Sequence, residues 1–202
     1  MIDIRRKSPL AHRETLGARD ASVRLCERAF DDKLILRVSP EIEAAKALGF
    51  LPPPNRSAEM EGGAALWLGP DEWMVFSPPG EGGALAARLG KALGKTHHQI
   101  TDVSDYYTRI GISGSKAGET LMKLTPLDLH PRAFKTGDVA GTVFGKAAGW
   151  ILNRSGKVAV FDIFIRWSMA DYLWCLIAEA GREFGLPAQT PAGQVRGLRH
   201  KA

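Results

Sequence analysis

The chain has 202 residues, of which 45% are hydrophobic and 24% charged, a balance typical of a globular protein that excludes wholesale disorder. Lysine and arginine outnumber aspartate and glutamate by 27 to 22, and much of this small excess lies at the two ends. Terminal charge runs of this kind favour solvated tails over docking onto an acidic partner or a nucleic acid. The densest apolar stretch, residues 172–178, is too short to cross a bilayer, and no signal peptide is apparent. Cys26 and Cys175 lie far apart and lack metal-type spacing, so we expect a cytoplasmic protein with no membrane partner.

In chain order, the first 21 residues are polar and show no sustained hydrophobic period. We therefore expect residues 1–21 to form an extended N-terminal arm. Residues 34–38 are a short β-type run closed by Ser39-Pro40, and residues 41–48 form a helix that ends before Gly49. Three consecutive prolines at 52–54 predict a stiff linker.

Two apolar runs follow, residues 65–68 and 73–76, on either side of Gly69-Pro70-Asp71-Glu72. Four turn-forming residues between such runs predict a β-hairpin. Apolar residues at helical spacing then predict a helix over residues 85–93, which Gly94 ends.

The second half of the chain is predicted to repeat this order. Strands are expected over residues 99–103, 108–113, 139–144, 150–152 and 158–165. One helix is expected over residues 117–124, and a last helix has Ser168 as its N-cap and Asp171 in a capping-box-like position. The apolar stripe of this last helix leaves Trp174 on its outer side.

These elements predict an α+β protein with two pseudo-repeated β-α-β-β-α lobes packed together. The lobes would span residues 22–96 and 97–186 within one domain over residues 22–186. A basic C-terminal tail, residues 187–202, would follow.

Several motifs resemble functional sites without meeting their requirements. Residues 90–96 resemble a phosphate-binding loop, but the two glycines are one residue too close and the segment ends a helix. No G-x-G-x-x-G follows a strand, so no dinucleotide site is predicted. His97 and His98 are adjacent and have no nearby acidic or thiol partner, which favours a loop over a metal site. Asp102 and Asp105 could form an acid–base pair, but satisfying the N–H groups of a turn is the favoured interpretation. The residues themselves predict no catalytic, cofactor-binding or metal site.

Five stretches resemble the gamma subunit of heterotetrameric sarcosine oxidase: residues 6–12, 68–73, 101–105, 126–134 and 161–166. The most specific are Leu-Gly-Pro-Asp-Glu-Trp at 68–73 and Pro-Leu-Asp-Leu-His-Pro at 126–131. Members of this family resemble the aminomethyltransferase (T-protein) of glycine cleavage, so the resemblance implies a folate-binding T-protein-like fold.

The resemblance also implies partners and chemistry. The expected partners are alpha, beta and delta subunits, and no nucleic acid. FAD, FMN, NAD, zinc and tetrahydrofolate would be bound by those partners, with no cofactor on this chain. The complex would oxidatively demethylate sarcosine to glycine, pass electrons to oxygen and transfer the one-carbon unit to tetrahydrofolate.

The T-protein pattern contains a Gly-Gly-Ile-Leu-Asp-Asp stretch whose acidic residues serve its chemistry. The best local match is residues 149–154, where Asn153 and Arg154 replace the two acids. The resemblance thus indicates a fold that has been kept while catalysis has been lost. The alternatives are a stand-alone folate-binding protein or aminomethyltransferase-like enzyme and, ranked last, a nucleic-acid binder.

As a subunit, the chain would dock mainly on the alpha chain. The candidate interface residues are Arg6, Pro9 and His12 in the arm, together with Trp174, which is either an interface anchor or a member of a satellite core. We expect the arm to become ordered on assembly, so that its removal weakens assembly and leaves the isolated fold intact.

Overall fold

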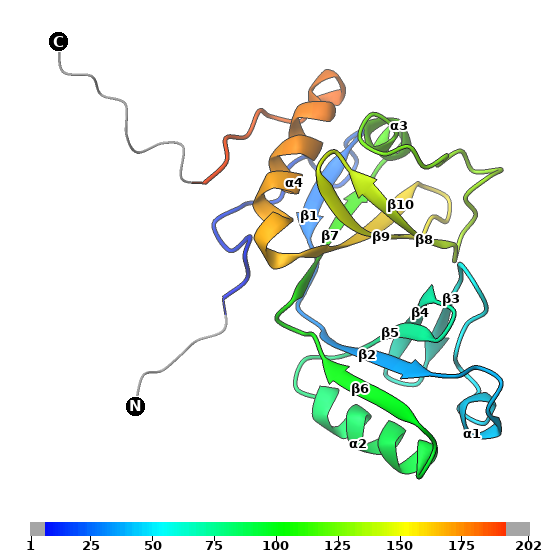
Figure 1. Cartoon of the computed structure of the whole chain (residues 1–202). Coiled ribbons are helices and arrows are strands. Elements are labelled where there is room, and N and C mark those ends of the chain that lie inside the picture. Colours follow the sequence, from blue (N-terminus) through cyan, green and yellow to red (C-terminus); the bar gives the residue numbers. More distant parts are fainter. Residues whose placement is uncertain (1–6, 193–202) are drawn as a thin grey trace, which may run out of the picture.

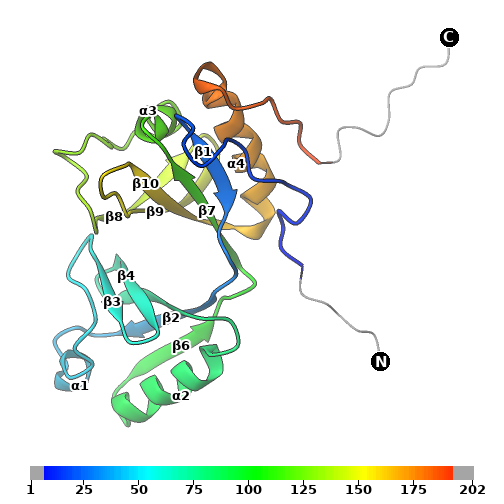
Figure 2. The same ribbon diagram turned by 180° about the vertical axis from the view of Figure 1, so that it is seen from behind.

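The computed structural model describes residues 7–192, which form two five-stranded antiparallel sheets (Figures 1 and 2). The strands of the first sheet are, in spatial order, β3 (Ser57–Met60), β4 (Gly63–Gly69), β5 (Glu72–Ser77), β2 (Asp32–Val38) and β6 (His98–Asp102). Those of the second sheet are β1 (Arg24–Glu27), β7 (Tyr107–Ser113), β10 (Val160–Arg166), β9 (Ala147–Asn153) and β8 (Val139–Phe144).

The helices cover the outer faces of the two sheets, giving four layers in the order helix, sheet, sheet, helix (Figure 1). Helices α1 (Glu43–Lys46) and α2 (Gly82–Leu93) pack on the first sheet. Helices α3 (Ala117–Met122) and α4 (Trp167–Ala180), followed by the short 3-10 helix η1 (Arg182–Phe184), pack on the second. The inner faces of the sheets meet in an apolar cluster that includes Leu66, Met74, Phe76, Val139 and Phe164. The predicted α+β class is confirmed.

The internal repeat is longer than the sequence indicated, and its first strand is exchanged. The repeating order is β-β-α-β-β-β-α, once from β1 to α2 and once from β6 to α4. Strand β1 does not join the first sheet but pairs with β7, so that Arg24 is opposite Ser113. Strand β6 in turn pairs with β2, so that Leu34 is opposite Asp102. The predicted lobes 22–96 and 97–186 therefore each contribute one strand to the sheet of the other.

Most apolar runs form the predicted strands, including the hairpin of β4 and β5 and the paired strands β8, β9 and β10. The last helix begins one residue before its predicted cap: α4 starts at Trp167, Arg166 is its N-cap and no side chain caps it. The prediction of Ser168 as N-cap is therefore wrong, and Asp171 has a different role. Across the described part of the chain, no helix is both long and apolar enough to cross a bilayer.

The described part of the N-terminal arm folds back onto the second sheet and is not an extended segment. Leu10 is 1% exposed and Leu16 is 8% exposed, and both belong to the core under α3 and α4. The backbones of Leu16 and Leu25 exchange two hydrogen bonds of 2.9 Å each. Because these leucines are buried by the chain itself, residues 8–16 are ordered without a partner.

Candidate functional site

The four candidate interface residues fall in different environments. Arg6 lies outside the described residues. Pro9 is half-buried and lines a cavity of about 70 Å³ between the N-terminal segment and the second sheet. His12 is exposed, with 43% of its side-chain area accessible. Trp174 is only 1% exposed.

The position of Trp174 corrects the prediction that it lies on the outer side of its helix. Helix α4 is buried on two sides, because one side faces the sheet and the N-terminal segment covers the side that carries Asp171 and Cys175. Trp174 shares a buried cluster with Leu10 and Leu16. It contributes to the core of the chain and is not available as an exposed anchor.

The side chain of Asp171 joins the two ends of the described chain. Its Oδ1 atom accepts hydrogen bonds from Nε2 of His12 at 2.8 Å and Nε of Arg13 at 2.7 Å. Its Oδ2 atom accepts one from the backbone N–H of Ala192 at 2.8 Å. Arg13 also donates to the carbonyl oxygen of Thr190 at 2.8 Å. We call this set, His12, Arg13, Asp171 and residues 189–192, the Asp171 junction.

Burial alone would raise the pKa of Asp171, but the N–H of Ala192 and the side chains of Arg13 and His12 hold that pKa below its ordinary value. These donors stabilise the ionised carboxylate. The junction is therefore built on a charged aspartate at neutral pH.

A second group of charges lies between the sheets. Asp162 on β10 is fully buried and accepts hydrogen bonds from Nε of Arg28 at 2.7 Å and Nη1 of Arg154 at 3.3 Å. Arg109 on β7 lies 4.0 Å from Asp162 and 3.0 Å from Asp31, which directly precedes β2. Burial raises the pKa of Asp31 and lowers the pKa of Arg109. Because Arg109 lies on the second sheet and Asp31 directly precedes a strand of the first, the Arg109–Asp31 ion pair connects the two sheets.

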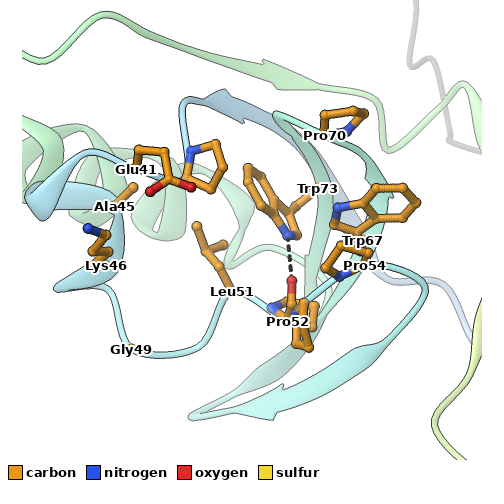
Figure 3. A pocket seen from close by; sticks show the side chains of 12 residues that line it. Glu41, Ala45, Lys46, Gly49, Leu51, Pro52, Pro54, Trp67, Pro70 and Trp73 are labelled. Carbon is orange, nitrogen blue, oxygen red and sulfur yellow. Dashed lines mark hydrogen bonds between the residues drawn. The ribbon is translucent and has the colours of Figure 1, made fainter.

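A groove of about 650 Å³ opens on the first lobe beside α1 (Figure 3). Trp73 forms part of its wall, is 2% exposed and donates from Nε1 to the carbonyl oxygen of Pro52 at 3.1 Å. The lining consists of Pro40, Glu41, Ala45, Lys46, Gly49, Leu51, Pro52, Pro53, Pro54, Trp67, Pro70 and Trp73. Five prolines and two indoles make the groove apolar and rigid. Its two ionisable side chains, Glu41 and Lys46, do not form an acid–base pair with each other in the structure.

The motifs that only resembled functional sites have structural roles. Residues 90–94 end α2, with Gly94 as its C-cap. The N–H of Ser104 donates to Oδ1 of Asp102 at 2.9 Å, which confirms the predicted turn. Residues 7–192 contain no group of three His, Cys, Asp or Glu side chains that could hold a metal ion.

Comparison with known proteins gives the family. The sarcosine oxidase gamma subunit family model matches residues 41–183. The gamma subunit of an Arthrobacter sarcosine oxidase is 39% identical over 195 residues, covering 90% of this chain and 93% of that protein. The corresponding protein of Corynebacterium sp. (strain P-1) is 38% identical over 139 residues, covering 64% of this chain and 68% of that protein. The chain belongs to the sarcosine oxidase gamma subunit family.

Among solved structures, this chain is similar to one chain of the heterotetrameric sarcosine oxidase from Corynebacterium sp. U-96. The TM-score is 0.79 with 30% identity, and the match covers 92% of this chain and 98% of that chain. The aminomethyltransferase T of Bartonella henselae matches with a TM-score of 0.60 at 16% identity, over 81% of this chain and 47% of that one, which shows a shared fold. Both matches confirm the T-protein-like architecture.

The two motifs most specific to the gamma subunit resemblance have clear places in the structure. Residues 68–73 form the turn between β4 and β5, and two of them, Pro70 and Trp73, line the groove. In residues 126–131, Leu129 is buried and Oδ1 of Asp128 accepts the N–H of His130 at 2.9 Å. The first motif thus shapes a surface, and the second fixes a turn.

Asn153, which replaces an acid of the aminomethyltransferase pattern, is 4% exposed at the end of β9. Its Nδ2 atom donates to the carbonyl oxygen of Phe134 at 2.7 Å, and its Oδ1 atom accepts the N–H of Ser155 at 2.8 Å. Both ends of the amide are therefore used to hold backbone. The sequence alone offered no signal for this role, because the partners lie in two separate loops.

Proposed function

We propose that this chain is the non-catalytic gamma subunit of a heterotetrameric sarcosine oxidase and supports its assembly with alpha, beta and delta subunits in the cytoplasm. The observation that carries the proposal is the length of the structural match, 98% of one chain of such a complex. A chain whose whole fold corresponds to one subunit of an assembly is expected to work within that assembly.

The environment of Asn153 supports a non-catalytic role. An amide cannot act as a carboxylate base, and here both of its polar atoms are already bonded to backbone groups. Arg154, at the second acidic position of the pattern, pairs with the buried Asp162. The residues at these two positions therefore hold loop backbone and neutralise a buried charge within the second sheet.

The chemistry would then belong to the other subunits. They would bind FAD, FMN, NAD, zinc and tetrahydrofolate, oxidise sarcosine to glycine, reduce oxygen and pass the one-carbon unit to tetrahydrofolate. This chain would contribute folded surface to a permanent interface.

Co-expression with alpha, beta and delta subunits, followed by purification through a tag on this chain, tests the proposal. We expect a yellow, flavin-containing complex that oxidises sarcosine, while the chain expressed alone carries no flavin.

The curated aminomethyltransferases of Saccharopolyspora erythraea and Koribacter versatilis are 30% and 38% identical to this chain in the matched regions, but the chain spans only 33% and 24% of their lengths. A chain that ignores the three subunits and binds tetrahydrofolate by calorimetry would instead favour the folate-enzyme alternative.

A further inference from the structure

The two sheets of the described chain end in four edge strands, β1, β3, β6 and β8, and one of these differs from the rest (Figure 1). Edge strands are usually protected from pairing with other chains by charged side chains or by a covering segment. Strands β3 and β6 carry the acids Glu59 and Asp102. Strand β1 carries Arg24 and Glu27, and the backbone of Leu16 bonds to it. Strand β8, with the sequence Val-Ala-Gly-Thr-Val-Phe, has no charged residue and no proline.

The outer side of β8, away from β9, is occupied at its beginning. There the N–H of Val139 donates to the carbonyl oxygen of Asn55 at 2.8 Å. In an antiparallel strand the backbone groups of every second residue point to the same side. The N–H and C=O groups of Gly141 and Val143 therefore point outward like the N–H of Val139, whereas those of the residues between them face β9.

The outer side is occupied again just after the strand, where the N–H of Gly145 donates to the carbonyl oxygen of Leu124 at 2.8 Å. Between these two contacts, no described residue bonds the outward backbone groups of Gly141 and Val143. Both residues are exposed, and Val143 has 44% of its surface accessible. The middle of β8 thus presents backbone donors and acceptors that a further strand could use.

Positive charge lies at both ends of this edge. The N–H of Lys135 donates to Oδ2 of Asp138 at 2.6 Å, which places Lys135 beside the start of β8. Lys146 lies in the turn that follows β8. Both lysines are exposed, and neither forms a salt bridge with another described residue. The carboxylate of Asp138 is neutralised by Arg56, so the edge is uncharged along its length and positive at its ends.

We propose that the outer edge of β8 binds an extended segment of a partner subunit as an added strand of the second sheet, and that this segment carries acidic side chains near its ends. The inference rests on the proposed function. Backbone hydrogen bonds to Gly141 and Val143 would supply affinity, as they do where a peptide extends a sheet. Attraction to Lys135 and Lys146 would fix the register of the added segment.

A second copy of this chain suits the edge less well. If two copies paired through β8, Lys146 of one copy would lie near Lys135 of the other in the antiparallel arrangement, and identical lysines would face each other in the parallel one. Like charges placed opposite each other destabilise a pair of strands. An acidic segment removes this repulsion.

Amide hydrogen exchange resolved to single residues tests the proposal, by comparing the free full-length chain with the purified tetramer. The amides of Gly141 and Val143 should exchange at least about tenfold more slowly in the tetramer than in the free chain. The amide of Thr142 faces β9 and is the internal reference. It should be protected in both samples.

A variant of the edge gives a second measurement. Val143→Pro removes one outward N–H, and an edge strand tolerates proline where the N–H has no partner within the sheet. The variant and a differently tagged wild-type chain are co-expressed with alpha, beta and delta subunits, and the ratio of tags in the purified tetramer should fall about fivefold. Val143→Thr keeps the N–H and a β-branched side chain, so this matched control should incorporate like the wild type. Circular dichroism identifies the temperatures at which both variants are folded.

The same competition tests the charge of the bound segment. Lys135→Gln combined with Lys146→Gln should lower incorporation about threefold at low salt, and the difference should shrink at high salt. Arg88→Gln combined with Lys91→Gln removes two exposed cations of α2 and should incorporate like the wild type. Equal losses in the two double variants would show that net charge explains the effect, and the bound segment would not be acidic.

If the amides of Gly141 and Val143 exchange equally fast in the free chain and in an active tetramer, the inference is wrong and the proposed function stands. Incorporation of Val143→Pro at the wild-type level would also overturn the inference. Protection of these amides that grows with the concentration of the free chain would identify a second copy as the occupant instead. Failure of the wild-type chain itself to form a tetramer would contradict the proposed function.

Discussion

The Nε atom of Arg28 lies 2.7 Å from Oδ1 of Asp162. Arg28 directly follows β1 and Asp162 lies on β10, and β7 separates these two strands in the sheet. The guanidinium crosses β7 at Gly111, which pairs with both Cys26 and Asp162. A Cβ atom at Gly111 would lie 2.3 Å from Nε of Arg28. The missing side chain of one residue thus allows a buried carboxylate to be neutralised.

Gly111→Ala should therefore destabilise the fold. Displacing Arg28 removes the shortest ion pair of the fully buried Asp162 while Arg154 and Arg109 remain, and losing one hydrogen bond to a charged group costs about 1.5–3 kcal/mol. Urea unfolding would measure this cost. Gly118→Ala on α3 is the matched control, because its Cβ would meet only Phe161 at 3.9 Å, and a helical alanine is favourable. Similar free energies of unfolding for the two variants would contradict this account.

Leu10→Ala should reduce the stability of the isolated chain by about 2–5 kcal/mol, because it leaves a cavity in the core beneath the N-terminal segment. Deletion of residues 1–6 serves as the control and should leave the free energy of unfolding unchanged. The sequence-based expectation was instead that the whole arm, residues 1–21, could be removed without destabilising the isolated fold. A thermal midpoint unaffected by Leu10→Ala would show that the segment contributes nothing to the free chain.

The Asp171 junction should open in acid. The pKa of Asp171 is lower in the folded chain than its ordinary value near 3.8, as burial is outweighed by the N–H of Ala192, Arg13 and His12. A carboxyl group with a depressed pKa stabilises the fold above its unfolded-state pKa and loses that contribution as pH falls through the folded pKa. The junction should therefore be intact at neutral pH and be lost progressively below about pH 4.

Amide hydrogen exchange at Ala192 would follow this transition. Protection should decrease as the carboxylate is protonated, and Asp171→Asn should weaken the protection of Ala192 at neutral pH and remove its dependence on acid. An Ala192 amide that stays protected at pH 2 would show that the carboxylate does not hold it.

Asn153→Asp, which restores an acid of the aminomethyltransferase pattern, should destabilise the chain without creating a base usable in catalysis. Its carboxylate would face the carbonyl oxygen of Phe134, which now accepts a hydrogen bond of 2.7 Å. The lost bond and the buried charge should together cost about 2 kcal/mol or more at pH 7. Asn55→Asp, at an exposed turn, is the control. An Asn153→Asp chain as stable as the wild type would mean that the site tolerates the acid.

The apolar runs were sufficient to predict the strands that bury side chains, because alternation and turn residues act locally. Strands β1 and β3 were missed, since Arg-Leu-Cys-Glu and Ser-Ala-Glu-Met are short and carry no clear period. These two strands lie at sheet edges, where pairing with a neighbour rather than sequence pattern defines them. The exchange of β1 and β6 had no local signal at all.

The candidate site was less predictable because it depends on contacts across the chain. His12 was named as a candidate interface residue, but its partner Asp171 was assigned to a helix cap. Trp174 was placed on the outside because a helical stripe describes one buried face, whereas the N-terminal segment buries a second face of α4. When a segment distant in sequence covers a second face of a helix, the spacing of apolar residues along the helix does not reveal that this face is buried.

The exchanged strands bear on how the chain acquires its structure as it leaves the ribosome. Strand β1 emerges early, yet its partner β7 belongs to the second repeat, and the first sheet lacks β6 until residue 102 has been made. Neither sheet has all of its strands while only the first repeat has been synthesised. The second sheet must also wait for β10, on the far side of β7. Completion of the second sheet is thus deferred until β10 has been made, well after the first sheet has all its strands, and the unpaired edge of β7 is exposed to other nascent strands during that interval.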